Sequence, residues 1–476
     1  MIDGLKRIVA LATAASLAGC NFAPAYQVPA MPVPVAYKEA GPWQVASPDA
    51  PRLAVDWWTV FGDPTLDRLE GQVATSNPTL AGALARYDQA RAYLGEAKAD
   101  MLPQLGVDTD LTRNRQSDHR PLRSADQPSF YSADTVQAEL SYEVDLWGRV
   151  RNTVAAGRAE VQASGDDLAD IRLSLEAQLA VDYMRLRGDD RQRELLSATV
   201  AAFAQADKVT RRRFQGGIAS GLDTGRSGDE LAEAQAQLDD VQAARALEEH
   251  AIASLVGTPA SNFSLASATI DLPIPPAPAA LSSTLLERRP DIAAAERRVA
   301  AANAEIGATK AAFFPAITLG GNFGVQNTGL PGLFSAPNVL WSIGPSAVLT
   351  IFDGGRRHAE LAAARARWSY ATAQYRSQVL AAFQQVEDNL AQLHHLGDEA
   401  QDEARAVDRA AQTERLSLHR YTKGAVDYLD VVTAQTTALR VRRTALDLET
   451  RRLEASIGLV RALGGGWTKA DRALQQ

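Results

Sequence analysis

Apolar residues recur every three or four positions over long stretches of the chain, which is the spacing of amphipathic helices. Two such stretches, Pro78 to Met101 and Pro290 to Phe314, each run into a proline, Pro103 or Pro315. Proline cannot continue a helix interior, because it lacks the backbone N–H and its ring clashes with the preceding turn. The pattern therefore predicts that the chain ends a helix in the same way twice.

After each proline, apolar and polar residues alternate, which is typical of a strand with one apolar face. Four runs alternate in this way: QLGVDTDLT from Gln104, TVQAELSYEVDLWG from Thr135, the run from Ile317 to Gln326, and LWSIGPSAVLTIF from Leu340. A polar, arginine-rich loop over 113–132 separates the first two, and a Gly/Pro-rich loop separates the last two. We therefore expect four strands in two pairs, with Asp108, Asp110, Glu139 and Glu143 on a wet face.

A glycine turn follows each strand pair, and a long helical pattern follows the turn. These patterns cover about Val150 to Phe214 and about Arg356 to Tyr421, or roughly 100 Å of helix each at 1.5 Å per residue. They end at FQGGIASGLD and YTKGAVDYLD, whose Gly217 and Gly424 are 207 positions apart, and a second helix returns from each. Helices of this length need neighbouring helices to bury their apolar stripes, so we predict long antiparallel coiled-coil hairpins.

The matching order of helix, strands and hairpin predicts an internal duplication. Gly95 and Gly307, Lys98 and Lys310, and Pro103 and Pro315 are each 212 positions apart, so unrelated coiled coils with chance matches do not explain the register. The predicted organisation is a signal peptide at 1–19, an N-terminal extension at 20–77, a first repeat at 78–257, a Pro-rich linker at 258–289, a second repeat at 290–464 and a tail at 465–476.

The N-terminus has the pattern of an export signal. Lys6 and Arg7 precede an apolar run from Ile8 to Leu17, and LAGC then ends at Cys20, the only cysteine of the chain. The LAGC ending resembles a bacterial lipobox, in which the cysteine becomes the lipidated N-terminus. The alternative is an ordinary signal peptide with an incidental cysteine. Asn21 is not the aspartate that retains lipoproteins at the inner membrane in enteric bacteria, so outer-membrane sorting is favoured.

No later stretch reaches the roughly 18 apolar residues of a membrane-spanning helix, so any further membrane segment must consist of strands. Four strands cannot close a barrel, because about eight are needed, whereas three copies of the chain would supply twelve. The alternative is a soluble β-sandwich with one solvated face.

A formal net charge of −8 argues against a nucleic-acid partner.

Several motifs together resemble one family, the outer membrane factors, in the lipoprotein (NodT-type) branch of the TolC and OprM family. These motifs are the lipobox, DWWTVFGDPTLDRLEGQV (Asp56 to Val73), NPTL, YEVDLWG and RRPDIAAAERRVAAANAEIGATKAAFFPAITL (Arg288 to Leu319). The resemblance implies a mainly α chain with transmembrane β-strands. Three copies would form a twelve-stranded β-barrel that continues as an α-helical periplasmic barrel.

By this resemblance the chain is the outer-membrane duct of a tripartite efflux system, most simply of the resistance-nodulation-division (RND) type. It would export small toxic compounds together with a periplasmic adaptor and an inner-membrane pump. Two alternatives remain open: the duct of a type I protein secretion system, and a structural coiled-coil lipoprotein that bridges the envelope layers.

No catalytic constellation stands out, and the residues predict neither an enzyme nor a cofactor or metal site. The adjacent His394 and His395 lie in a helical pattern, where neighbouring side chains diverge by about 100° and make a poor chelate.

Polar residues at the hairpin turns are the candidates for function. Asp427 and Asp430 flank Leu429, and a ring of such residues around a threefold axis could set cation preference. The alternative is that both aspartates only cap a helix start. The resemblance places Leu429 and Asp430 at the family's periplasmic aperture and puts Thr433 where relatives have a second aspartate. Asp223 is the equivalent of Asp430 in the first repeat, and Arg226 follows it.

Two further pairs complete the candidates. Gly217 and Gly424 are turn residues, and the resemblance implies that these tips also dock the adaptor. Phe313 and Phe314 precede Pro315, where aromatic residues of a membrane-water interface are expected. The alternative is that these two aromatics are buried in a core.

Overall fold

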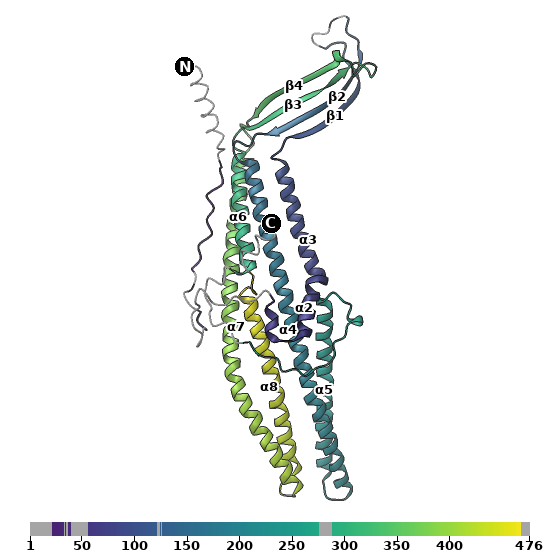
Figure 1. Cartoon of the computed structure of the whole chain (residues 1–476), viewed down its shortest axis with the longest axis vertical. Coiled ribbons are helices and arrows are strands. Elements are labelled where there is room, and N and C mark those ends of the chain that lie inside the picture. The colour runs from purple at the N-terminus through teal and green to yellow at the C-terminus, as the bar shows by residue number, and fades with distance from the viewer. Residues whose placement is uncertain are drawn as a thin grey trace. The chain divides into compact units, whose positions relative to one another are not determined.

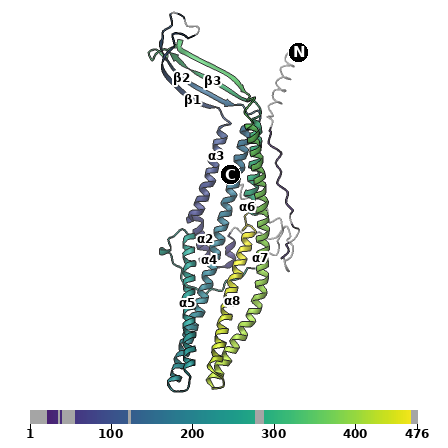
Figure 2. The ribbon, with the colours of Figure 1, turned by 180° about the vertical axis from the view of Figure 1, so that it is seen from behind.

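The computed structural model describes residues 21–32, 34, 37–39, 56–120, 124, 126–275 and 288–467. The chain divides into two compact units (Figures 1 and 2). Unit 1 comprises Met1–Ala30, Arg86–Ser164 and Ala294–Tyr375, and unit 2 comprises Met31–Ala85, Gly165–Ala293 and Arg376–Gln476. Unit 1 holds the sheet and unit 2 holds the helical hairpins.

The same order of elements occurs twice. The first set is α3 (Pro78–Ala99), β1 (Gln104–Arg115), β2 (Phe130–Glu143), α4 (Arg149–Gln215) and α5 (Gly221–Leu255). The second set is α6 (Pro290–Ala311), β3 (Ala316–Asn327), β4 (Val339–Val348), α7 (Arg356–Thr422) and α8 (Tyr428–Ala462). Corresponding helices have equal lengths of 22, 67 and 35 residues. The predicted fold class, mainly α with four strands, is confirmed.

Shorter elements complete the described chain. They are η1 (Trp57–Phe61), α2 (Pro64–Ser76), η2 (Ala260–Asn262) and η4 (Ala336–Asn338). None of the helices in the described ranges is both long enough and apolar enough to cross a membrane.

The sheet of unit 1 is antiparallel, with the strands side by side in the order β1-β2-β3-β4 (Figure 1). The pairing register puts the apolar residues of all four strands on one face, as the alternation predicts; Leu105 pairs with Leu140, and Phe323 with Trp341. That face consists mainly of Leu105, Val107, Leu111, Val136, Ala138, Leu140, Tyr142, Leu319, Phe323, Val325, Val339, Trp341 and Ile343. None of these side chains is buried, and Trp341 is 70% exposed.

The opposite face of the sheet is polar. Asp108 pairs with Gln137, and Asn322 lies between Glu139 and Ser342 in the register. Gln137 donates to Glu139 over 2.6 Å and accepts from the Asn322 amide over 3.2 Å. One face therefore suits an apolar environment and the other suits water.

Two strand boundaries differ from the alternation pattern. β1 and β2 continue to the Arg115–Phe130 pair, so the loop between them is shorter than 113–132. β4 ends at Val348, so Leu349 and Ile351 lie beyond it, contrary to the prediction. The reason is that Val348 pairs with Ala316, the first residue of β3 after Pro315, and β4 has no partner further on.

The core of unit 2 forms where η1 and α2 pack against α4 and the ends of the hairpins. Trp57, Leu66, Leu69, Tyr183 and Ile457 are almost completely buried in one cluster. α2 begins at Pro64, and the Asp63 side chain caps it by accepting from the Thr65 amide over 2.8 Å. This cap also positions the Asp63 carboxylate to accept a hydrogen bond from the Tyr183 hydroxyl, which connects α2 to α4.

One carboxyl group sits inside this core. Glu70 of α2 is 1% exposed, and neither of its side-chain oxygens has a hydrogen-bond partner within the described residues. Burial, followed by the nearby Glu176 carboxylate, raises the pKa of Glu70 from 4.5 to about 10. The folded state therefore binds more protons than the unfolded state between about pH 4.5 and pH 10. Stability falls as pH rises through this window.

We predict that Glu70→Gln raises the melting temperature at pH 8 by about 2 °C or more and has a much smaller effect at pH 5. The amide carries no charge at either pH, so the cost of burying a charge or holding a proton disappears. The measurement is thermal unfolding of the detergent-solubilised protein at both pH values. Arg68→Gln, an exposed change on the same helix, is the control. Equal effects of Glu70→Gln at pH 5 and pH 8 would contradict the prediction.

Candidate functional site

The turn between α4 and α5 forms the first hairpin tip, residues 216–226. Gly217 has a φ of 72°, in the left-handed region that favours glycine, and the Ile218 amide donates to the Arg213 carbonyl over 2.8 Å to close the end of α4. Ser220 then caps α5 with a capping box. Its hydroxyl accepts from the Asp223 amide over 3.1 Å, and the Asp223 carboxylate accepts from the Ser220 amide over 3.0 Å. The Asp223 carboxylate is therefore engaged in the helix cap.

The second hairpin tip, residues 423–433, repeats the backbone but not the cap. Gly424 has a φ of 73°, and the Ala425 amide donates to the Arg420 carbonyl over 2.9 Å. Asp427 is the N-cap residue of α8, yet its side chain makes no capping hydrogen bond. The exposed Asp430 carboxylate has no hydrogen bond or ion pair within the described part of the chain. Capping by side chains therefore accounts for Asp223 but not for Asp427 or Asp430.

Two exposed leucines precede these aspartates. Leu429 is 46% exposed, and Leu222, its equivalent 207 positions earlier, is 61% exposed. Thr433 follows Leu429 by one turn on the same exposed face of α8, and its hydroxyl donates to the Leu429 carbonyl over 2.9 Å. Arg226, the equivalent of Thr433, is half-buried. Leu222 was not among the residues expected from the sequence, although the 207-residue register of the glycines points to it.

Aromatic residues beneath the tips join the two hairpins of unit 2. Tyr421 of α7 and the buried Tyr428 of α8 have ring centroids 5.4 Å apart, and the Arg213 guanidinium of α4 lies 4.7 Å from the Tyr421 ring centroid. Burial raises the pKa of Tyr428, and a hydrogen bond with Thr210 of α4 lowers it in part. The two tips are thus held together from below while their outer residues remain exposed.

Polar contacts continue this link along the hairpins. Ser227 of α5 donates to the buried Asp207 of α4 over 2.8 Å, and Arg211 pairs with the same carboxylate over 2.6 Å. The Arg211 hydrogen bond holds the pKa of Asp207 below its usual value, although burial opposes this. The Thr436 hydroxyl of α8 donates to Glu230 of α5 over 3.2 Å.

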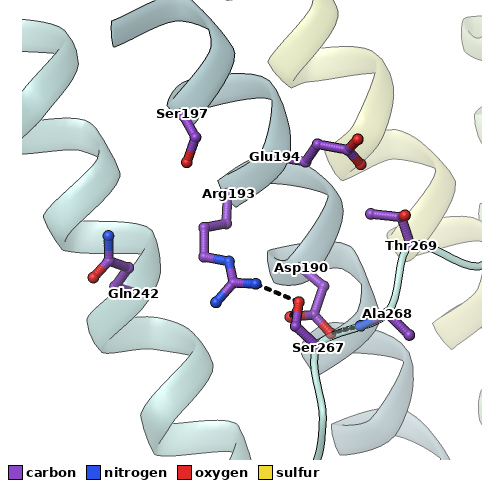
Figure 3. A pocket seen from close by; sticks show the side chains of 8 residues that line it. All are labelled: Asp190, Arg193, Glu194, Ser197, Gln242, Ser267, Ala268 and Thr269. Atoms are coloured by element: carbon purple, nitrogen blue, oxygen red, sulfur yellow. Dashed lines mark hydrogen bonds between the residues drawn. The ribbon is translucent and has the colours of Figure 1, made fainter. Parts of the chain in front are cut away.

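An open pocket of about 560 Å³ lies higher in unit 2, where α4 and α5 meet the segment after η2 (Figure 3). Asp190 is its hub and accepts from Ser267 over 2.6 Å, from the Ala268 amide over 3.1 Å and from the guanidinium groups of Arg187 and Arg245. Burial alone would raise the pKa of Asp190, but these hydrogen bonds outweigh it and hold the pKa below its usual value. Figure 3 shows Arg193 directed toward Ser267, while Glu194 points away. The hub fastens the inter-repeat segment to the hairpin, and its own carboxylate is fully engaged by these donors.

The joint between helices and strands in unit 1 is an aromatic cluster. Phe314 stacks against both Phe22 and Trp147, with centroid distances of 4.4 and 5.0 Å, and the centroids of Phe22 and Trp147 are 6.4 Å apart. The Trp147 indole N–H donates to the Pro315 carbonyl over 2.8 Å, so the joint of one repeat is bonded to the joint of the other. Phe313 packs edge-on against His358 at 5.1 Å. Phe313 is half-buried and Phe314 is 37% exposed, so neither lies in a closed core.

The first described residues form a strap along α6, also within unit 1. Beside Phe22, Ala23 lies against Gly307, and the Asn303 side-chain amide donates to the Pro24 carbonyl over 2.8 Å. The Tyr26 hydroxyl donates to Glu296. Cys20 lies outside the described residues, but Asn21 follows it directly, so the strap begins one residue after the predicted lipid attachment.

The adjacent histidines of α7 are exposed and lie beside an aspartate. His394, His395 and Asp398 hold their donor atoms within 4.8 Å of one another, and the two imidazole centroids are 5.1 Å apart. The expected divergence overlooked Asp398, which is one turn further along the same face. All three residues are exposed, and donor atoms around one zinc ion would have to be closer, at about 3.3 Å for bonds of about 2 Å.

Comparisons with known proteins agree with this architecture. The chain is 31% identical to the toluene efflux pump outer membrane protein TtgF of Pseudomonas putida over 468 residues, covering 96% of each chain. It is 28% identical to the probable outer membrane lipoprotein SilC of Salmonella typhimurium over 474 residues, covering 97% of this chain and 99% of that one. The solved structure of the outer-membrane channel OprN has a TM-score of 0.86 and 26% identity, covering 94% of this chain and all of that one.

The fold is therefore that of an outer-membrane channel subunit. The model of the outer membrane efflux protein family matches residues 69–258 and 281–465, one segment for each set of elements. The chain belongs to the outer membrane efflux protein family.

The strap leads to a test with a matched pair of glycines. A Cβ on Gly307 would lie 2.7 Å from the backbone nitrogen of Ala23, whereas nothing lies within 4 Å of one on Gly95, its equivalent in the first repeat. We predict that Gly307→Ala displaces the strap and increases hydrogen exchange over residues 21–26. Gly95→Ala should leave the strap unchanged and stabilise α3 by up to about 1 kcal/mol.

The measurement is hydrogen exchange together with thermal unfolding of each full-length variant. If Gly307→Ala stabilises the protein as Gly95→Ala does, with exchange of the strap unchanged, then the contact with Ala23 does not constrain position 307.

Proposed function

We propose that three copies of this chain form a passive duct through the outer membrane of a Gram-negative bacterium and export small toxic compounds from the periplasm. The duct would work with a periplasmic adaptor and an inner-membrane pump, most simply of the RND type, and catalyse no reaction of its own. The observation that carries this proposal is the sheet of unit 1, which exposes an entirely different chemistry on each face and has two open edges.

The open edges favour assembly. β1 and β4 are the outer strands of the sheet, so each has one row of backbone N–H and C=O groups without a partner strand among the described residues of the same chain. In lipid these groups have no water to bond with, and each unpaired group costs several kcal/mol. Pairing β1 of one copy with β4 of the next satisfies both rows, and three copies close a ring of twelve strands.

The two faces support the orientation of the ring. An apolar face with Leu105, Phe323 and Trp341 exposed suits contact with acyl chains, and the polar face with Asp108, Glu139 and Asn322 suits a water-filled lumen. The reverse orientation would place carboxylates in lipid, and charged side chains on the lipid face destabilise a barrel, most strongly near the bilayer midplane.

The lipid anchor is a further part of the proposal. The strap starts at the residue after Cys20. Its first aromatic residue, Phe22, packs against Phe314 and Trp147, beside the Pro315 joint. A lipid on Cys20 would therefore enter the membrane close to where the strands begin. Partly exposed aromatic rings at this level support an interfacial position for the joint.

The hairpin tips are proposed as the periplasmic aperture. Leu429, Asp430 and Thr433 share the exposed start of α8, and three copies around an axis would present a leucine ring beside a carboxylate ring. Asp427, Asp223 and Arg226 lie at the same level of the hairpins. Gly217 and Gly424 keep the turns at the tips compact. The adaptor would dock at these turns.

Conductance tests the duct directly. Purified protein added to planar bilayers should open stable single channels, and a deletion strain should become sensitive to toxic compounds and recover with the intact gene. A structural envelope lipoprotein would give no channels. A type I secretion duct would conduct but leave the drug and metal susceptibility panel unchanged, with loss of one secreted protein instead.

We predict that Asp430→Ala lowers the preference for cations and weakens block by a trivalent cation about fivefold or more. The basis is that a carboxylate within about 4 Å contributes about 1 kcal/mol even in water. Asp223→Ala is the matched control, because its carboxylate serves the capping box. It should lower stability by about 1 kcal/mol and change selectivity less than Asp430→Ala does, since its carboxylate is held against the helix start. The measurement is single-channel recording with ion gradients, and unchanged selectivity and block in Asp430→Ala would remove Asp430 from the aperture.

A further inference from the structure

The apolar face of the sheet ends in two arginines. Arg113 and Arg115 of β1 alternate in phase with Leu105, Val107 and Leu111, so the register puts all five on the same face. The arginines are at the end of β1 that leads into the β1–β2 loop, away from the Pro103 joint. Both are exposed.

Within the described residues, these guanidinium groups have no anionic partner. Arg113 pairs across the strands with Ser132, and Arg115 pairs with Phe130, whose ring centroid lies 5.3 Å from the Arg115 guanidinium. Neither arginine forms an ion pair or a side-chain hydrogen bond to any part of the chain that the structure describes. The stack on Phe130 restrains Arg115 while its N–H groups stay free to donate.

The nearby acidic groups do not neutralise this pair. Asp134 lies opposite Leu111 on the same face but is buried, at 6% exposure. Asp118 in the loop accepts from the Ser129 hydroxyl over 3.0 Å. The remaining loop arginine among the described residues, Arg120, donates to Gln127. Arg113 and Arg115 are therefore exposed, positively charged and directly continuous with the apolar face.

The spacing fits the thickness of a membrane. Eight residues separate Leu105 from Arg113, which is about 26 Å along a strand and about 20 Å in height at a tilt of about 40°. An apolar band of an outer-membrane barrel is about 25 Å tall. The two arginines thus lie at the far edge of the band, at the level where lipid phosphates begin.

We propose that Arg113 and Arg115 bind the phosphate groups of an anionic, phosphorylated lipid in the outer leaflet. This inference rests on the proposed function, because it requires the apolar face to contact lipid. Two planar guanidinium groups can each make paired N–H···O bonds to phosphate, which lysine cannot. Edge-to-edge pairing of β1 with a neighbouring copy leaves the face free, so a trimer would carry three such sites.

The test uses the detergent-solubilised full-length protein and three probes: lipid A with two phosphates, the same lipid without phosphates, and inorganic phosphate. Native mass spectrometry counts the lipids retained by the protein. We expect wild type to retain the phosphorylated lipid about tenfold more strongly than the dephosphorylated one, with no competition from millimolar inorganic phosphate. R113Q/R115Q should lose this preference.

R120Q is the matched control for R113Q alone, because each removes one positive charge, and R120Q should keep the preference. R113K/R115K keeps the charge and should retain only part of it, which separates paired hydrogen bonding from net charge. If the double glutamine variant does not fold, R113Q alone should show a partial loss. Absence of a preference in wild type, or an equal loss in R120Q, would overturn the proposal.

Recording channels from the same preparations keeps the two proposals apart. Channels in wild type without any preference for the phosphorylated lipid would reject the lipid site and leave the duct in place. Absence of channels would reject the duct instead.

Discussion

The unpaired backbone at the two edges of the four-stranded sheet is the constraint on which the rest of the molecule depends. A strand edge in lipid has no water to bond with, so one chain cannot place β1 to β4 in a membrane alone. Pairing between copies removes both edges at once. In the closed barrel, the apolar face of the sheet then lies outside and the polar face lines the lumen. The exposed Trp341 and Phe323, which would be a liability on a soluble monomer, become the lipid-facing surface.

The joints between helices and strands are where this sheet is connected to the hairpins. α3 and α6 end at Ala99 and Ala311, four residues before Pro103 and Pro315, through which a helix cannot continue. The structure adds the bond from the Trp147 indole to the Pro315 carbonyl, which connects the two repeats at the same level. Phe22 completes the aromatic cluster, so the segment next to the proposed lipid attachment is packed on the joint itself.

The two repeats share a backbone and differ in the chemistry placed on it. Asp223 completes a capping box with Ser220. In the second repeat, the N-cap residue Asp427 makes no side-chain cap, and the carboxylate of Asp430, the equivalent of Asp223, stays free of hydrogen bonds within the described residues. Gly95 faces open space, whereas Gly307 lies against the strap. Duplication supplies the length and register of the helices, and the later differences give each repeat its own contacts. A function assigned to one repeat therefore does not transfer automatically to its equivalent in the other.

The sequence by itself determined the elements and their order, because proline, glycine and hydrophobic period act locally. Pro315 ends a helix, Gly424 permits a positive φ, and alternation around Leu105 assigns the faces of a strand, whatever lies elsewhere in the chain. Only the tertiary structure decided which polar groups are satisfied, because that depends on partners distant in sequence. The burial of Glu70 and the saturation of Asp190 by Ser267 and Arg245 carry no local signal. The end of β4 at Val348 was likewise decided by the tertiary structure, because β4 ends where its neighbour β3 offers no further partner.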